Sequence, residues 1–232
     1  LNAPNTIGIL VEPIQGEAGV VVPDTDFLKA IRTRCTETNT LFIADEIQTG
    51  LARTGSMLAV CGNCSCTDRC ERQETYQRPD ILILGKALGG GVYPVSGVFA
   101  DNSIMDVIKP GQHGSTFGGN PLAAAVATEA LNVLMDEHLM QNARRMGDKF
   151  RHAMQELVDQ NKIFTLVRGK GLLKREHSVL SPLGYGVAFL SNALHRKAMG
   201  ALLERVVFSS SGVLPFGTQD YPTRHLSLTP GN

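Results

Sequence analysis

An acid and a lysine each follow a short apolar segment of the sequence. Asp45 comes after Leu-Phe-Ile-Ala, and Lys86 comes after Ile-Leu-Ile-Leu-Gly. Ligands of open parallel sheets bind at the carboxyl ends of the strands, so both residues are candidates for one site. A lysine amine can form a Schiff base with an aldehyde, and an acid can keep a pyridine nitrogen protonated. This chemistry is that of a pyridoxal 5'-phosphate (PLP) site; a structural salt bridge at the sheet end is the alternative.

Two glycine-containing segments favour the cofactor interpretation. Lys86 is followed by Ala-Leu-Gly-Gly-Gly, which leaves room for a bulky ring near the backbone. The segment from His113 to Asn120 (HGSTFGGN) supplies hydroxyls, backbone N–H groups and a helix start, which together suit a phosphate. Turn formation alone would also explain these glycines.

The elements that would position these residues have the order of a parallel α/β sheet. Apolar runs predict strands at residues 6–11, 41–44, 81–84 and 95–100. Asp24 or Thr25 can cap a helix between the first two strands, because its apolar positions follow a period of 3.6 residues. These positions are Phe27, Leu28, Ile31 and Cys35.

Two longer helices are predicted in the second half of the chain. Asn120 and Pro121 are typical of a helix start, as N-cap and first helical residue. A second helix over residues 137–160 has an apolar stripe that indicates core packing: Met140, Ala143, Met146, Phe150, Met154 and Leu157. After Leu173 the pattern weakens; residues 190–208 are amphipathic, and residues 209–232 show no periodicity.

Composition favours a small-molecule partner. Lys plus Arg and Asp plus Glu each number 22 in 232 residues, so the sequence has no electrostatic footprint for nucleic acid or an anionic membrane. No apolar run approaches the roughly 20 residues that cross a bilayer. The five cysteines do not resemble a secreted disulfide framework. We therefore expect an intracellular compartment, the cytoplasm or the mitochondrial matrix.

Four of the cysteines lie in one polar loop. Four thiolates could enclose a tetrahedral zinc ion, but structural zinc sites usually pair two separated knuckles. An exposed, variable insertion without metal is therefore the preferred interpretation. The four residues are Cys61, Cys64, Cys66 and Cys70.

Four segments together resemble the class III aminotransferases. They are VEPIQGEAG (11–19), FIADEIQTG (42–50), LGKALGGG (84–91) and HGSTFGGNP (113–121). Residues 93–96, 108–111 and 167–173 are most similar to the ornithine branch of this family. The resemblance covers about residues 6–173, whereas residues 174–232 do not match.

The resemblance implies an α/β fold like that of the fold type I PLP-dependent transferases. Residues 1–136 would be the carboxy-terminal part of a large, mostly parallel-sheet domain that binds the cofactor. Residues 137–173 would begin a small carboxy-terminal domain, and residues 174–232 would be an atypical tail. Because family members are much longer, we expect that a large amino-terminal part is absent from the sequence.

The resemblance also assigns roles to residues. Lys86 would carry PLP and move a proton to and from the substrate carbon, and Asp45 would pair with the pyridine nitrogen. Ile47 would pack on one face of the ring, and Gln48 would bond its phenolic oxygen.

Other implied contacts involve a second subunit and the substrate. Ser115 and Thr116 would reach the cofactor phosphate of a neighbouring subunit in a homodimer with shared active sites. Glu17 would pair with an arginine and govern which end of the substrate reacts. That arginine is expected after Leu173, but the arginines there stand in unrelated contexts: Arg175, Arg196, Arg205 and Arg224.

The activity implied is transfer of the terminal amino group of ornithine to 2-oxoglutarate, which gives glutamate semialdehyde and glutamate. Two alternatives stay open. The family member could act on acetylornithine or aminobutyrate, or the chain could be truncated and catalytically inactive.

Overall fold

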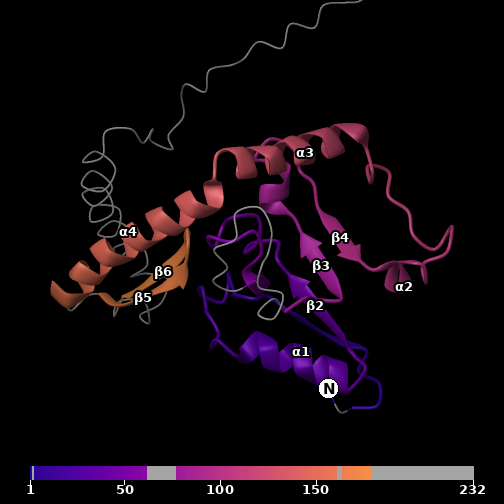
Figure 1. The fold of residues 1–232 in the computed structure, drawn as a ribbon, viewed down its shortest axis with the longest axis horizontal. Coiled ribbons are helices and arrows are strands. Elements are labelled where there is room, and N and C mark those ends of the chain that lie inside the picture. Colours follow the sequence, from indigo (N-terminus) through magenta and orange to yellow (C-terminus); the bar gives the residue numbers. More distant parts are fainter. Residues whose placement is uncertain (2, 62–76, 161–163, 179–232) are drawn as a thin grey trace, which may run out of the picture. The chain divides into compact units, whose positions relative to one another are not determined.

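The computed structural model describes residues 1, 3–61, 77–160 and 164–178. Leu1–Val179 form one compact unit. Its elements follow one another as β1 (Gly8–Val11), α1 (Phe27–Glu37), β2 (Leu41–Asp45), η1 (Ala59–Cys61), β3 (Ile81–Leu84), η2 (Lys86–Gly89), β4 (Gly97–Ala100), α2 (Asn102–Met105), α3 (Pro121–Asp136), α4 (Leu139–Gln160), β5 (Phe164–Lys170) and β6 (Leu173–Ser178) (Figure 1).

The larger sheet has the strand order β1-β2-β3-β4. The first three strands are parallel, and β4 runs antiparallel to β3. The four predicted strands are therefore present, although β1 and β4 each begin two residues later than predicted. Since β1, β2 and β3 are parallel, their carboxyl ends meet at one edge of the sheet.

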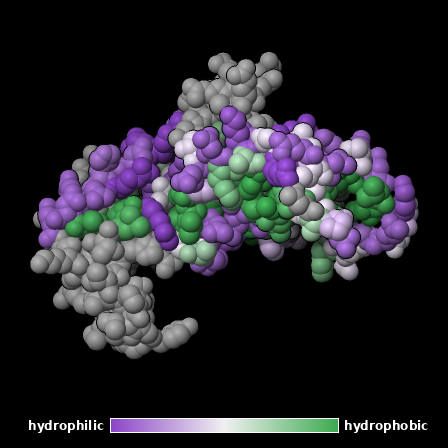
Figure 2. Space-filling view, turned by 90° about the horizontal axis from the view of Figure 1, so that it is seen from below, coloured by the Kyte–Doolittle hydropathy of each residue, from purple (hydrophilic) through white to green (hydrophobic). Residues whose placement is uncertain are grey.

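Helix α1 packs against β2 through the predicted apolar positions. Ile31 and Cys35 of α1 form a buried cluster with Phe42 and Ala44 of β2 and with Val60. The predicted side-chain cap at Asp24 or Thr25 is wrong: α1 begins after Asp26, which has a helical φ of −92° and forms no side-chain cap. The helix start is held instead by a backbone turn. Figure 2 shows hydrophobic patches (green) between hydrophilic regions on one face of the molecule.

Helix α3 covers the region after β3. Leu84 and Leu88 are buried together with Leu51, and half-buried residues of α3 pack against them. The predicted start of α3 is confirmed, because the side chain of Asn120 accepts a hydrogen bond of 2.8 Å from the N–H of Ala123 and Pro121 is the first helical residue. This packing fixes the segment that follows β3.

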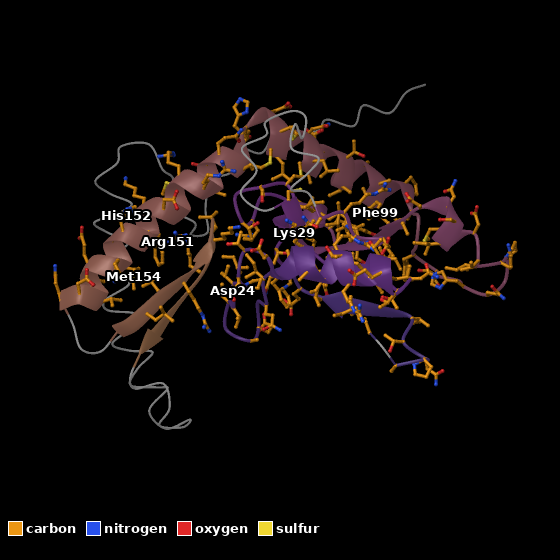
Figure 3. All side chains as sticks on the ribbon, turned by 60° about the horizontal axis from the view of Figure 1, so that its bottom comes forward. Asp24, Lys29, Phe99, Arg151, His152 and Met154 are labelled. Carbon is orange, nitrogen blue, oxygen red and sulfur yellow. The ribbon has the colours of Figure 1, made fainter. Side chains whose placement is uncertain are left out.

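Helix α4 buries its apolar stripe against the smaller sheet. Met140, Ala143 and Met154 are buried as predicted (Figure 3 labels Met154 on α4). Strands β5 and β6 form an antiparallel hairpin that the sequence did not predict. The amphipathic residues 190–208 lie outside the described residues. None of the described helices has the length and apolar character needed to cross a bilayer.

Candidate active site

Asp45 and Lys86 lie at the carboxyl ends of neighbouring strands. In the register of β2 with β3, Asp45 is opposite Ile83, three positions before Lys86. The pairing continues one residue further, where the N–H of Glu46 donates to the carbonyl of Ile83 at 3.0 Å. Asp45 is half-buried, its carboxylate accepts a 3.0 Å hydrogen bond from the N–H of Ile47, and within the described residues it forms no ion pair with Lys86.

Lys86 is exposed and has an uncommon backbone conformation. Its φ is +44°, in the left-handed region that costs a non-glycine residue roughly 1–2 kcal/mol. Gly85 before it lies against Ile47: a Cβ placed at Gly85 would be 3.3 Å from Cγ2 of Ile47. Ile47 is therefore beside the backbone that carries Lys86, as a ring-packing residue requires.

Gln48 and Glu17 contact each other, although they are far apart in the sequence. Nε2 of Gln48 donates to Oε1 of the exposed Glu17 at 3.0 Å. Oε1 of Gln48 is buried and finds no hydrogen-bond partner among the described residues. It lies over Gly16, where a Cβ would overlap with it. Unsatisfied buried polar atoms are rare in folded proteins, so this amide is poised for a further polar partner.

Ser115 and Thr116 lie in an exposed segment before α3. Ser115 Oγ accepts a 2.9 Å hydrogen bond from the N–H of Gly118. No contact among the described residues brings Ser115 or Thr116 to Asp45 or Lys86. The described residues of one chain therefore do not bring these two hydroxyls to Asp45 and Lys86.

Glu46 is a structural acid that the sequence interpretation passed over. It is 1% exposed, and its carboxylate accepts hydrogen bonds from the hydroxyl of Thr49 and, at 2.8 Å, from the N–H of Val60. Burial raises the pKa of Glu46, hydrogen bonds from Thr49, Val60 and Ala59 lower it, and the charge of Asp45 raises it further. Glu46 thus ties the end of β2 to the η1 turn. In the sequence, the position of Glu46 directly after Asp45 was the one sign that it could matter for the site.

A cavity of about 430 Å³ opens beside Asp45. Glu12 and Gln15 line it together with Asp45, along with apolar residues of β1 and α1. Lys86 is not among its lining residues. The N–H of Gly16 donates to Glu12 Oε2 at 2.8 Å, which holds the loop that also carries Glu17.

Most of the cysteine-rich loop lies outside the described residues. Cys64, Cys66 and Cys70 lie outside the described residues, and only Cys61, at the end of η1, lies within them. In the described part of the chain, no group of three or more His, Cys, Asp or Glu side chains could hold a metal ion.

Comparison with known proteins identifies the family of the chain. The family model of class III aminotransferases matches residues 1–176. The chain belongs to this family. Mitochondrial ornithine aminotransferase of Rattus norvegicus is 53% identical over 173 residues, which cover 75% of this chain and 36% of the relative. The class III aminotransferases are PLP-dependent enzymes of fold type I, so the expected fold class is confirmed.

Two solved structures are similar in sequence and fold. Acetylornithine aminotransferase from Elizabethkingia anophelis is 56% identical with a TM-score of 0.64, covering 72% of this chain and 39% of that chain. Ornithine aminotransferase from Toxoplasma gondii, with partial occupancy of PLP at its active site, is 47% identical with a TM-score of 0.68 over 77% of this chain and 39% of that chain. This chain thus spans well under half the length of the proteins that it matches.

Proposed function

We propose that the protein to which these residues belong is a PLP-dependent aminotransferase that transfers the terminal amino group of ornithine to 2-oxoglutarate. The observation that carries the proposal is the placement of Lys86 and Asp45 at the ends of paired parallel strands. The strained backbone of Lys86 supports it, because residues held in rare conformations cluster at functional sites.

The residues present fit PLP. When bound, PLP supplies an aromatic electron sink for the charge that is left when the substrate carbon loses a proton. The exposed amine of Lys86 would hold the aldehyde carbon until the amine of the substrate displaces it, and the freed Lys86 amine would then accept and return that proton. The carboxylate of Asp45 would hold a proton on the pyridine nitrogen, and Ile47, beside Gly85, would pack on the ring.

Gln48 and Glu17 would act together. The two ends of an amide exchange places by rotation, so the buried end of Gln48 can present an N–H donor to the phenolic oxygen. Rotation would release Glu17 from its present partner, and Glu17 would then be available to an arginine. The contact at 3.0 Å therefore couples the residue proposed for the cofactor with the one proposed for substrate choice.

A second substrate, N-acetylornithine, has support of its own. The solved relative with 56% identity is an acetylornithine aminotransferase, whereas the curated relatives at about 50% identity are ornithine aminotransferases. Both substrates present a terminal amine, and they differ in whether the α-amine is free. Glu17 and the family motifs favour ornithine.

Segment exchange tests this choice. The aligned part of the rat ornithine enzyme and of the Elizabethkingia acetylornithine enzyme is replaced by residues 1–173. Glutamate formation from 2-oxoglutarate is then measured with ornithine and with N-acetylornithine. If residues 1–173 carry the ornithine preference, both chimaeras favour ornithine by kcat/KM. If each chimaera keeps the preference of its host, the assignment to ornithine is wrong.

We also propose that the active protein is a homodimer within the cell. Ser115 and Thr116 would contribute to the partner's phosphate site, which is consistent with their exposure. Large apolar side chains of the same region are exposed, among them Val107 at 68% and Phe117 at 78%. Exposed apolar side chains that gather in one region are typical of an interface.

A further inference from the structure

A second polar cavity, which neither Asp45 nor Lys86 lines, lies where α4, β5 and a turn after β2 meet. Its volume is about 440 Å³, within the range of small-molecule sites. Three cationic side chains line it: Arg144 and Arg151 from α4, and Lys170 from β5. Among the lining residues in the described part of the chain, Asp148 is the one acid. Figure 3 labels Arg151 on α4.

Hydrogen bonds to backbone carbonyls hold the two arginines in place. Arg144 donates to the carbonyl of Gly55 at 2.8 Å, and Arg151 donates to that of Gly169 at 3.0 Å. The carboxylate of Asp148 is 3.9 Å from Arg151. The side chain of Lys170 forms no ion pair within the described residues. Backbone carbonyls thus anchor both arginines, and among the described lining residues the cations outnumber the acid Asp148.

Burial and the positive charge of this cavity lower the pKa of two lysines, Lys170 in its lining and Lys174 on β6. Burial, followed by the nearby charges of Arg144 and Arg151, lowers the pKa of Lys170. Lys174, which donates to the carbonyl of Gly169 at 3.2 Å, has its pKa lowered to about 8 by burial and by Arg151, although Asp148 opposes the shift. A bound anion would favour the charged form of both lysines and so oppose the lowering of their pKa by burial and by the arginines.

We propose that this cavity binds a small phosphate monoester. Cations reach the cavity from a helix and from a strand, so a tetrahedral oxyanion can accept hydrogen bonds from several directions. A bare phosphate ion would fill only part of about 440 Å³, which leaves room for a small organic group. The ligand would fasten α4 and β5 to the turn that carries Gly55.

Calorimetric titration of the purified chain at constant ionic strength tests the proposal, with glycerol 3-phosphate and inorganic phosphate as probes. We expect saturable binding of both, tighter for the ester, and a rise in Tm at saturation. Lys170→Gln and Arg151→Gln each weaken binding by about tenfold, because each removes a charge-assisted hydrogen bond. Lys170→Arg retains binding.

Matched controls separate a site from general attraction. Lys149 and Arg145 are exposed on the same helix and do not line the cavity, so Lys149→Gln and Arg145→Gln leave affinity within about threefold, since exposed charges are screened. Lys86→Ala also leaves it unchanged, which separates this cavity from the cofactor site. Absence of binding by the folded chain, or equal losses in the control and cavity variants, overturns the proposal.

Discussion

Asp45 and Glu46 are adjacent carboxylates that the fold places in opposite environments. Asp45 is half-buried at the candidate active site, whereas Glu46 is buried under the η1 turn. Successive side chains along a strand point to opposite faces of the sheet. We therefore expect Glu46, the residue after Asp45, to leave the face that Asp45 occupies. The sequence could not reveal that Glu46 is buried, since its burial depends on Thr49 and on a turn that begins 13 residues later at Ala59.

The pH dependence of stability should report on Glu46. Burial raises its folded-state pKa above the ordinary value of 4.5, so between these two pH values the folded chain holds a proton that the unfolded chain has released. The resulting stability is present below pH 4.5 and is lost as pH rises through the raised pKa. We therefore expect Glu46→Gln to be increasingly favoured over the original chain from pH 5 upward in urea denaturation. The exposed Glu156→Gln serves as a control; parallel curves for Glu46→Gln and the original chain would contradict this.

Asp45→Asn should retain bound cofactor but lose transamination by at least about 100-fold, because a misplaced electrostatic partner of the reacting group typically costs that much. Without the carboxylate, the pyridine nitrogen is no longer held protonated. The measurement is ornithine turnover in the rat chimaera that carries residues 1–173, with cofactor absorbance as the binding control. Near-normal turnover would show that Asp45 has only a structural role.

At the level of elements, hydrogen bonds to backbone carbonyls and a close approach at Gly171 join the β5–β6 hairpin to the rest of the unit. The N–H of Leu172 donates to the carbonyl of Arg53 at 2.9 Å. Arg168 donates to the carbonyl of Gly19 at 2.8 Å. Gly171 has a φ of +51°, and a Cβ there would overlap with Thr54 and lie 2.7 Å from the nitrogen of Gly55. The turn of the hairpin therefore fits against residues 54–55 only because residue 171 has no side chain.

Gly171→Ala should lower the free energy of unfolding by about 2–5 kcal/mol, the sum of a left-handed backbone cost and an overpacking cost. Gly111→Ala is the matched control, because Gly111 also has a positive φ, +84°, but nothing lies within 4 Å of its Cβ position. We expect about 1–2 kcal/mol for the control. Equal losses in urea denaturation would mean that the contact with Thr54 and Gly55 has no energetic weight.

The strands of the main sheet were predictable, whereas the hairpin was not. Residues 41–44 and 81–84 are continuous apolar runs, as expected for strands covered on both faces. Strand β6, LKREHS, has no such run or alternation, so its pairing with β5 depends on tertiary contacts. Likewise the strand-end positions of Asp45 and Lys86 followed from local pattern, but the contact of Gln48 with Glu17 joins residues 31 positions apart.

For the molecule as a whole, the described sheet has open edges. Among the described residues no strand pairs with the outer side of β1 or of β4. Ile7 beside β1 is 83% exposed, and Phe99 of β4 is 50% exposed (Figure 3 labels Phe99). Apolar edges of this kind promote pairing with another chain or aggregation.

The 232-residue chain alone should therefore be a poor enzyme. We expect weak cofactor binding, marginal stability and little ornithine turnover. The open sheet edges would need further strands to cover them, and Glu17 would need an arginine; the described residues supply neither. Glutamate semialdehyde formation is measured for the chain alone and mixed with the full-length rat relative, with light scattering as the aggregation control. Robust turnover by the chain alone would mean that residues 174–232 supply the missing arginine.

The identity of the lysine that holds PLP tests the central claim most directly. The chain is saturated with PLP, reduced with borohydride and mapped by peptide mass spectrometry. We expect the pyridoxyl label on Lys86, and its loss in a Lys86→Ala variant that keeps its secondary structure. Lys174 is the internal competitor, because burial and Arg151 lower the pKa of its amine to about 8, so that part of it is unprotonated near neutral pH. A label on Lys174 or any other lysine, with Lys86 unmodified, would contradict the assignment of the active site.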